Sequence, residues 1–339
     1  MQQAVKQRAE VLIVGAGMAG LTAASELKLA GHNVLVVEKG RGVGGRCATR
    51  RIGQAALDHG AQFLTARDLR FVNLVDEWRR AGVVEEWHRG SAGATEGHAR
   101  WRGIPGMTAM AKYLAYNLDV RLREQVISLR NDRDRWIATL ENGKSLSADA
   151  VVLTAPVPQS LALLEAGGVG LDAAMRTRLE SIGYDRCLAV LAVLDGPSQI
   201  PAPGGKALGE DPIAWLADNQ IKGVSSIPAV TIHATAAFSH LRWSDDRNEV
   251  GKELLRAAGP WLGSNVVTFQ VQGWRYAKAV HVEKSGCLVL NEQPPLLIAG
   301  DAFAAPRVEG AVLSGWAAAA TLDQMAPVNP EFLSEKKRE

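Results

Sequence analysis

Three glycines near the start of the chain have the spacing of a diphosphate-binding turn. The aliphatic run Val11-Leu-Ile-Val14 leads directly into Gly15-Ala-Gly-Met-Ala-Gly20. Four aliphatic residues in a row predict a strand buried on both faces of a parallel sheet. Gly15 would permit the tight turn, Gly17 the close approach of a diphosphate, and Gly20 close packing of helix on strand. A helix is predicted over Met18–Ala30, with Ala19 in its first turn. Its N-terminal N–H groups would be offered to the anion.

An acidic residue ends the next predicted strand. Val34-Leu-Val-Val37 is followed by Glu38 and Lys39, and Glu38 lies at about the 20-residue spacing of a ribose-binding acid. Its carboxylate could accept both ribose hydroxyls, and it would repel a 2′-phosphate, so NADP is not expected here. Strand, glycine turn, helix, strand and acid together predict dinucleotide binding. A close-packed βαβ crossover without a ligand is the alternative.

Size and composition indicate an ordinary globular protein with two lobes. The chain has 339 residues, of which 47% are hydrophobic and 22% charged, and its formal net charge is +2. The small charge offers no electrostatic case for nucleic acid or a membrane surface as a partner. No apolar stretch approaches the roughly 20 residues of a membrane span. The polar N-terminus is not a signal peptide, and Cys47, Cys187 and Cys287 are far apart, so we expect a cytoplasmic protein without a metal site.

Periodicity along the chain predicts two kinds of structure. Phe71, Leu74, Val75 and Trp78 indicate an amphipathic helix, and further helices are expected over about 107–117, 171–182, 247–262 and 310–325. Strands are expected at 125–130, 135–141, 150–154 and 295–299, and a separate antiparallel set at 186–194, 213–218, 229–236 and 266–274. The nucleotide-type pattern thus occurs at the start, middle and end. We predict an α/β protein with a discontinuous Rossmann-type domain and an inserted, mainly antiparallel α+β substrate domain.

Two later motifs narrow the type of dinucleotide. Gly44-Gly45-Arg46 follows the acidic residue, and Gly300-Asp301 follows the last apolar strand. With the opening turn they resemble FAD-dependent oxidoreductases of the glutathione-reductase and amine-oxidase type. The resemblance implies that Arg46 neutralises the diphosphate and that Asp301 lies near the diphosphate and ribityl chain. It also implies that the final helix points its N-terminus at the flavin, where it would stabilise the negative charge of the reduced ring.

Longer blocks resemble one branch, the bacterial renalase-like proteins. They are 41–46 (RGVGGR), 57–67 (LDHGAQFLTAR), 101–107 (WRGIPGM), 232–234 (IHA), 274–277 (WRYA) and 307–315 (RVEGAVLSG). The resemblance covers roughly residues 11–325. It implies non-covalent FAD and a fold like that of p-hydroxybenzoate hydroxylase. It further implies that 2- or 6-dihydro isomers of NAD(P)H are oxidised to NAD(P)+, with electrons passing to O2 and H2O2 as a product.

The resemblance assigns cofactor contacts along the whole chain, each with a plainer alternative. Gly60, Ala61, Gln62 and Phe63 would run along the isoalloxazine, or form an ordinary loop. Val126 would hold the adenine through its backbone, or be a core valine. The complete set of expected FAD contacts is Gly15, Gly17, Met18, Ala19, Gly20, Glu38, Lys39, Gly45, Arg46, Gly60, Ala61, Gln62, Phe63, Val126, Gly300, Asp301, Glu309, Gly310, Ala311 and Ser314.

Three residues are candidates for contact with the substrate. Strand alternation places His233 on one face with Thr231 and Thr235, where it could line a pocket or meet water. Lys278 invites comparison with the lysine that holds a water at flavin N5 in amine oxidases, and is otherwise a solvated lysine. Trp274, like Trp101 and Trp243, could stack on a planar substrate or belong to the core.

The chain departs from the family at two places, and other functions stay open. Ala279 stands where relatives commonly have proline, and Ala302 where many have an aromatic residue. We expect the FAD domain to comprise 1–68, 104–158 and 284–326, the substrate domain 69–103 and 159–283, and the tail 327–339. An amine oxidase or desaturase-type flavoenzyme is one rival, and a non-catalytic FAD-binding redox sensor is another.

Overall fold

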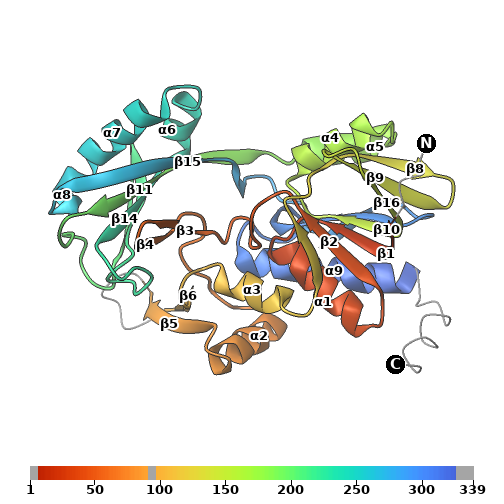
Figure 1. Ribbon diagram of the computed structural model, residues 1–339, viewed down its shortest axis with the longest axis horizontal. Coiled ribbons are helices and arrows are strands. Elements are labelled where there is room, and N and C mark those ends of the chain that lie inside the picture. Colours follow the sequence, from red (N-terminus) through yellow and green to blue (C-terminus); the bar gives the residue numbers. More distant parts are fainter. Residues whose placement is uncertain (1–6, 91–96, 326–339) are drawn as a thin grey trace. The chain divides into compact units, whose positions relative to one another are not determined.

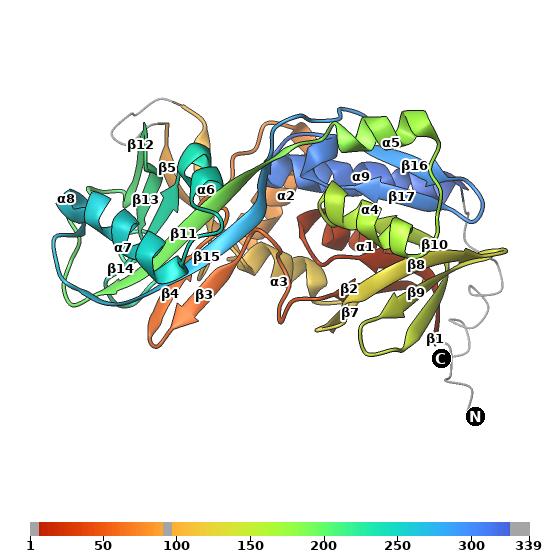
Figure 2. The ribbon, with the colours of Figure 1, turned by 90° about the horizontal axis from the view of Figure 1, so that it is seen from above.

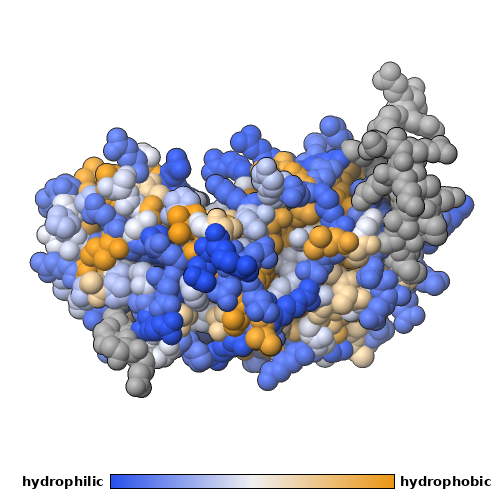
Figure 3. Space-filling model, turned by 90° about the horizontal axis from the view of Figure 1, so that it is seen from below, coloured by the Kyte–Doolittle hydropathy of each residue, from blue (hydrophilic) through white to orange (hydrophobic). Residues whose placement is uncertain are grey.

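The computed structural model describes residues 7–90 and 97–325, which belong to two compact units. Unit 1 draws on Met1–Gly45, Ala111–Gly183 and His281–Glu339, and unit 2 on Arg46–Met110 and Tyr184–Val280. None of the helices in the described ranges has the length and apolarity that a bilayer crossing requires. The face shown in Figure 3 is mostly hydrophilic, with apolar side chains in small groups.

A mainly parallel sheet forms the centre of unit 1. Its strand order is β16-β17-β10-β1-β2-β7, and the pairs from β17 to β7 are parallel while β16 is antiparallel. The first half of β10 also pairs with β9, which pairs with β8. The strands are β1 (Gln7–Val14), β2 (Val34–Glu38), β7 (Asp119–Leu122), β8 (Val126–Asp132), β9 (Arg135–Leu140), β10 (Ser145–Leu153), β16 (Cys287–Asn291) and β17 (Leu296–Ala299).

Two long helices of unit 1 lie side by side (Figure 1). A side chain at Gly315 would come within 2.4 Å of the Ala19 carbonyl oxygen, so glycine is what permits this approach. The two helices are α1 (Met18–Leu29) and α9 (Val308–Met325). The others of this unit are α4 (Val157–Ala166), α5 (Ala173–Glu180) and the short 3-10 helix Asp301–Phe303. Helix α3 (Ala109–Ala115) begins with the last residues of a unit 2 segment and continues into unit 1 along the chain.

Unit 2 is built on a five-stranded antiparallel sheet of order β12-β13-β14-β11-β15. Helices α6, α7 and α8 cover one face and the β3–β4 hairpin lies on the other (Figure 2). The sheet strands are β11 (Tyr184–Leu194), β12 (Gly205–Glu210), β13 (Ile213–Asp218), β14 (Ala229–Ala234) and β15 (Val266–Ala279). The remaining elements are β3 (Thr49–Ile52), β4 (Ala55–Asp58), α2 (Leu69–Arg80), β5 (Val84–Arg89), β6 (Ala99–Gly103), α6 (Ala236–Leu241), α7 (Arg247–Ala257) and α8 (Gly259–Leu262).

The predicted fold class is confirmed, whereas several local features differ. The helix expected over 247–262 is two helices, and 107–117 contains only the seven residues of α3. Helix α4 and the hairpins β3–β4 and β5–β6 were not expected. Residues 46–68 lie in unit 2, because Ala55 and Leu57 pack against Leu191 of the antiparallel sheet. Residues 104–110 also lie in unit 2 and 159–183 in unit 1, and the expected tail 327–339 is outside the described residues.

Candidate functional site

The turn after β1 has the geometry that a bound diphosphate requires. Gly15 has φ +112°, and a side chain on Gly20 would lie 2.0 Å from the Gly15 carbonyl oxygen. Thr154, at the end of β10, donates its hydroxyl to the carbonyl oxygens of Val14 and Gly15 at 3.0 and 3.1 Å. Gly17 differs, since a Cβ there would meet nothing within 4 Å. The turn is therefore tightly packed at Gly15 and Gly20, whereas the space beside Gly17 is open.

No side chain caps the N-terminus of α1, so its first N–H groups have no side-chain acceptor. Gly17 is the N-cap, it makes no side-chain capping bond, and the first turn carries no acidic residue. Met18 and Ala19, both buried, occupy this first turn. Orphan N–H donors beside an open position are the donor set that a phosphate needs. The geometry of this turn therefore fits the diphosphate of a dinucleotide.

Glu38 and Gly45 are both brought to that turn. The Glu38 carboxylate accepts from the Ala16 N–H at 2.9 Å and from the Gly40 N–H at 2.6 Å, which fixes it beside the glycines. Gly45, with φ +54°, approaches so closely that a Cβ on it would lie 3.4 Å from the Gly17 Cα. Lys39 is exposed and donates to the Gln159 amide oxygen at 3.3 Å, away from the turn. Val126 is buried at the start of β8, opposite Leu140.

The C-terminal motif lies in the same unit. Gly300 has φ +148° and donates its N–H to the Ser314 hydroxyl at 2.8 Å, and that hydroxyl donates to the Gly286 carbonyl oxygen at 2.6 Å. Ser314 thereby holds the loop that presents the buried Asp301. Gly310 must be a glycine, because a Cβ there would lie 2.0 Å from the Ala305 carbonyl oxygen. Glu309 is buried and pairs with Arg307 at 2.7 Å, and the Ala311 N–H donates to the Arg307 carbonyl oxygen.

Arg46 and the segment Gly60–Phe63 lie together in unit 2. A Cβ on Gly60 would come within 1.9 Å of the Arg46 carbonyl oxygen, and the same oxygen accepts from the Ala61 N–H at 2.9 Å. The Arg46 guanidinium donates to the Ala277 carbonyl oxygen on β15 at 3.4 Å. Backbone contacts thus join the glycine–arginine motif to the predicted flavin-facing segment.

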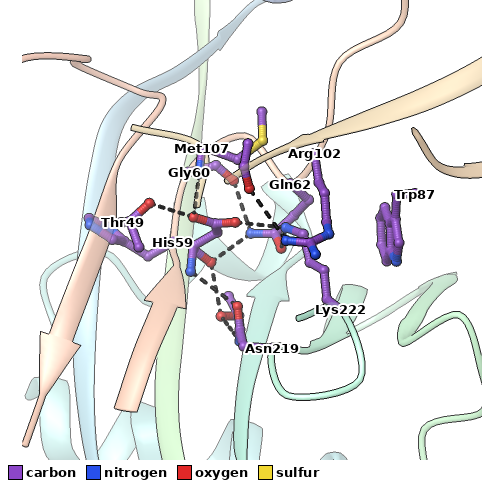
Figure 4. Close-up of polar contacts among 12 residues, drawn as sticks. Thr49, His59, Gly60, Gln62, Trp87, Arg102, Met107, Asn219 and Lys222 are labelled. Atoms are coloured by element: carbon purple, nitrogen blue, oxygen red, sulfur yellow. Dashed lines mark hydrogen bonds and ion pairs between the residues drawn. The ribbon is translucent and has the colours of Figure 1, made fainter. Parts of the chain in front are cut away.

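A buried ion pair anchors this segment, and its lysine was missed from the sequence. Asp58 and Lys222 are both fully buried, with 2.8 Å between Lys222 Nζ and Asp58 Oδ2 (Figure 4). The other carboxylate oxygen accepts from the Thr49 hydroxyl at 2.6 Å and the Met107 N–H at 2.9 Å. Burial lowers the pKa of Lys222, and the charge of Asp58 opposes that shift. Lys222 lies in the turn that follows β13 and belongs to no motif, so only the fold reveals it.

The backbone around Asp58 is as fully bonded as its side chain. Its N–H donates to Asn219 Oδ1 at 3.1 Å, and its carbonyl oxygen accepts from Thr231 Oγ1 at 2.9 Å and Gln62 Nε2 at 2.7 Å. The Gln62 amide oxygen in turn accepts from Lys222 Nζ at 3.4 Å. The network therefore fixes both ends of the segment from Asp58 to Gln62 (Figure 4).

The substrate candidates His233 and Trp274 converge on one atom, the carbonyl oxygen of His59. Trp274 Nε1 donates to it at 2.7 Å and His233 Nε2 at 3.2 Å. The rings of His59 and Trp274 are stacked at 5.2 Å. Thr231 is buried, and Thr235 caps α6 instead of continuing the strand. Lys278 is exposed, so the buried lysine of this unit is Lys222.

Both imidazoles are neutral at physiological pH. Burial lowers the pKa of His59 to about 4, helped by the nearby charge of Arg50, and burial likewise lowers the pKa of His233 to about 4. Because a carbonyl oxygen only accepts, neutral His233 carries its proton on Nε2. His59 Nδ1 is buried and has no hydrogen-bond partner in the described ranges.

We expect the protein to lose stability as the pH falls from about 6.5 to about 4. Across this window the unfolded chain takes up protons at His59 and His233 while the folded chain does not, so the free energy of unfolding decreases. By pH 4, each imidazole accounts for a decrease of up to about 3 kcal/mol in the free energy of unfolding. Urea unfolding of the wild type and of His59→Gln at several pH values tests this. The variant should show a shallower acid slope, and equal slopes would contradict the shifted pKa.

Comparisons with known proteins agree with this organisation. A family model described as NAD(P)-binding Rossmann-like domain matches residues 13–78, and one described as flavin containing amine oxidoreductase matches residues 87–323. Mouse renalase is 25% identical over 90% of this chain and 96% of its own length. A putative flavin-containing monoamine oxidase of Mycobacterium tuberculosis is 49% identical over 16% of this chain and 12% of its own.

Solved structures share the fold at low sequence identity. A putrescine oxidase triple mutant superposes with a TM-score of 0.71 at 15% identity, covering 95% of this chain and all of that one. A putative protoporphyrinogen oxidase from an Exiguobacterium species gives a TM-score of 0.70 at 13% identity, covering 96% and 100%.

Proposed function

Because this chain belongs to the flavin-containing amine oxidoreductase family, we propose that it oxidises a 2- or 6-dihydro isomer of NAD(P) to the aromatic nucleotide. It is an FAD-dependent oxidoreductase resembling renalase along nearly its whole length. The electrons would pass to O2 as the final acceptor, with H2O2 as the second product. Bound FAD would supply the two-electron acceptor, taking a hydride at N5.

The family resemblance assigns cofactor contacts to residues within each unit. In unit 1, the glycines of the first turn and the N-terminus of α1 would bind the diphosphate, and Glu38 the ribose. Gly300, Asp301 and the start of α9 would lie along the ribityl chain and flavin. In unit 2, Arg46 would approach the diphosphate, and the backbone of Gly60–Phe63 would lie along the isoalloxazine. These roles are supported by the family resemblance and by the geometry of the Gly15–Gly20 turn.

The charge of unit 2 is the observation that favours a nucleotide over an amine. Asp58, the buried carboxylate beside the predicted flavin segment, is already bound by Lys222, Thr49 and the Met107 N–H. It cannot also bind a substrate ammonium. The remaining charged side chains around the segment include Arg50 and Arg100, and the two histidines are neutral. Such a site would repel a cationic amine and attract an anion.

The proposed reaction places modest demands on these residues. A dihydropyridine becomes aromatic when it loses a hydride, so no side chain need remove a proton from carbon. Imidazoles with a pKa of about 4 are weak bases at neutral pH. The protein's part would be to hold the donor carbon about 3–3.5 Å from the acceptor atom and to exclude water.

Anaerobic mixing of the holoprotein with 6-dihydro-NAD should bleach the flavin absorption band within seconds, and air should restore it with release of H2O2. Putrescine serves as the comparison donor and should leave the band unchanged over the same time. Rapid-scan absorbance measures both reactions. Flavin that is bleached by putrescine and not by the dihydronicotinamide would make the protein an amine oxidase and overturn the proposal.

A further inference from the structure

Three aromatic side chains of unit 2 gather against the end of the predicted flavin segment. The Phe63 ring lies 6.2 Å from that of Trp87 on β5 and 5.8 Å from that of Trp215 on β13. Trp87 Nε1 donates to the Pro203 carbonyl oxygen at 2.7 Å, which fixes its ring. Gly205 is needed there, because a Cβ on it would lie 2.4 Å from Trp87. The aromatic cluster is therefore rigid and only partly covered.

Arg100 on β6 places its guanidinium over this cluster. Its Cζ lies 4.4 Å from the centre of the Phe63 ring, and the residue is half-buried. Within residues 7–90 and 97–325, it forms no ion pair and no side-chain hydrogen bond. Burial lowers the pKa of Arg100, although an arginine in a protein stays charged. The aromatic face compensates only a small part of the lost hydration.

The other arginines of the β5–β6 hairpin each have a carboxylate. Arg89 pairs with Glu86 at 2.8 Å, and Arg102 pairs with Glu85 across the hairpin. Lys222, whose ammonium lies 5.3 Å from the centre of the Trp87 ring, is neutralised by Asp58. Among the described residues, Arg100 thus differs from its neighbours in holding a partly desolvated positive charge without an anion.

The same cluster contains buried polar atoms without partners. Trp215 Nε1 and His88 Nε2 have none among the described residues. His88 lies opposite Arg100 in the hairpin register, next to a bulge between Glu86 and His88. Bulges of this kind re-aim side chains near functional sites. Unsatisfied polar groups and an uncompensated cation in one place are costly for a purely structural cluster.

We propose that Arg100 is a specificity-determining residue that binds the diphosphate of the nucleotide substrate, with Phe63 and Trp87 as the apolar wall beside it. The inference rests on the proposed function, because that function makes the substrate an anionic dinucleotide. A guanidinium suits a phosphate through paired N–H donors, and its stacking on Phe63 fixes their direction. The same charge would disfavour a cationic amine.

The test compares a substrate with phosphates and one without. Arg100→Gln should lower kcat/KM for 6-dihydro-NAD by about 10- to 100-fold, since it removes hydrogen bonds to a charged group. With the corresponding dihydronicotinamide riboside, which carries no phosphate, the loss should be less than about threefold. Arg89→Gln on the same hairpin is the matched control and should change neither value. Arg100→Lys, which keeps the charge, should recover part of the loss.

A binding measurement separates failure of this inference from failure of the proposed function. Calorimetric titration of the oxidised holoprotein with NAD+ should show Arg100→Gln weakening binding by the same factor, with FAD content unchanged. If the wild type binds NAD+ but dihydronicotinamides leave its flavin oxidised, the proposed function is wrong and the titration still decides the role of Arg100. Equal losses for dinucleotide and riboside, no loss for either, or a wild type that does not bind NAD+ would overturn the assignment of Arg100.

Discussion

Replacing Lys222 with methionine should lower the free energy of unfolding by about 3–5 kcal/mol, because it leaves the Asp58 carboxylate buried without its cation. Both members of the pair are fully buried, so water cannot take the place of the lost ammonium. The Thr49 hydroxyl and the Met107 N–H would still donate to Asp58, but neither carries a charge. Urea unfolding at neutral pH measures the effect.

Two further variants test whether the pairing itself is responsible. Asp58→Asn with Lys222→Met removes both charges and should be more stable than Lys222→Met alone, since no isolated ion is left. Lys252→Met breaks the exposed pair with Glu249 on α7 and should have little effect. A Lys222→Met protein as stable as Lys252→Met would show that the buried pair contributes nothing.

Gly17→Val should weaken FAD binding by about 100-fold or more while leaving the apoprotein folded. The backbone at Gly17 is extended, with φ −78° and ψ 179°, and a Cβ there meets no atom within 4 Å. Valine in place of a glycine N-cap costs about 1 kcal/mol. Its side chain would, however, occupy the place where a diphosphate must approach the α1 N–H groups. Losing two such charge-assisted bonds corresponds to about 100-fold or more in affinity.

Fluorescence titration of the apoprotein with FAD measures this affinity, and circular dichroism checks the fold. Gly170→Val is the matched control, because Gly170 is an exposed glycine of the same unit with no atom within 4 Å of a Cβ. The control should bind FAD normally. Retention of yellow colour and full FAD content by Gly17→Val would rule out the diphosphate at this turn.

Local signals account for most of what could be predicted in unit 1. The turn at Gly15, the acid at Glu38 and the loop at Gly300 follow strands whose aliphatic runs are recognisable alone. Parallel pairing of β1 with β2 and β10 then brings the carboxyl ends of these strands to one edge of the sheet, so no long-range contact has to be known in advance. Helix α4 was not predicted, because Pro156 and Pro158 follow directly on the strand expected at 150–154 and proline often ends an element, although Pro156 is the N-cap of this helix.

Unit 2 could be predicted less well, because its important contacts join residues far apart in sequence. Asp58 and Lys222 are separated by 164 positions, and no spacing rule connects them. His233 and Trp274 were singled out for their own chemistry, yet their shared partner is a backbone carbonyl oxygen, which a sequence cannot indicate. Lys278 was a candidate only because it resembles the lysine that holds a water at flavin N5 in amine oxidases. In the structure its side chain is exposed.

By itself, the sequence determined a glycine-rich turn after a buried strand and an acid at the spacing of a ribose-binding residue, and family resemblance extended this to an FAD enzyme. Those features are local, since glycine spacing and strand periodicity act over a few residues. Only the tertiary structure decided which charges are compensated. Lys222 meets a buried carboxylate and Arg100 meets an aromatic ring, although both are simply basic residues in the sequence. The difference arises because burial and partner, not residue type, set the energy of a charge.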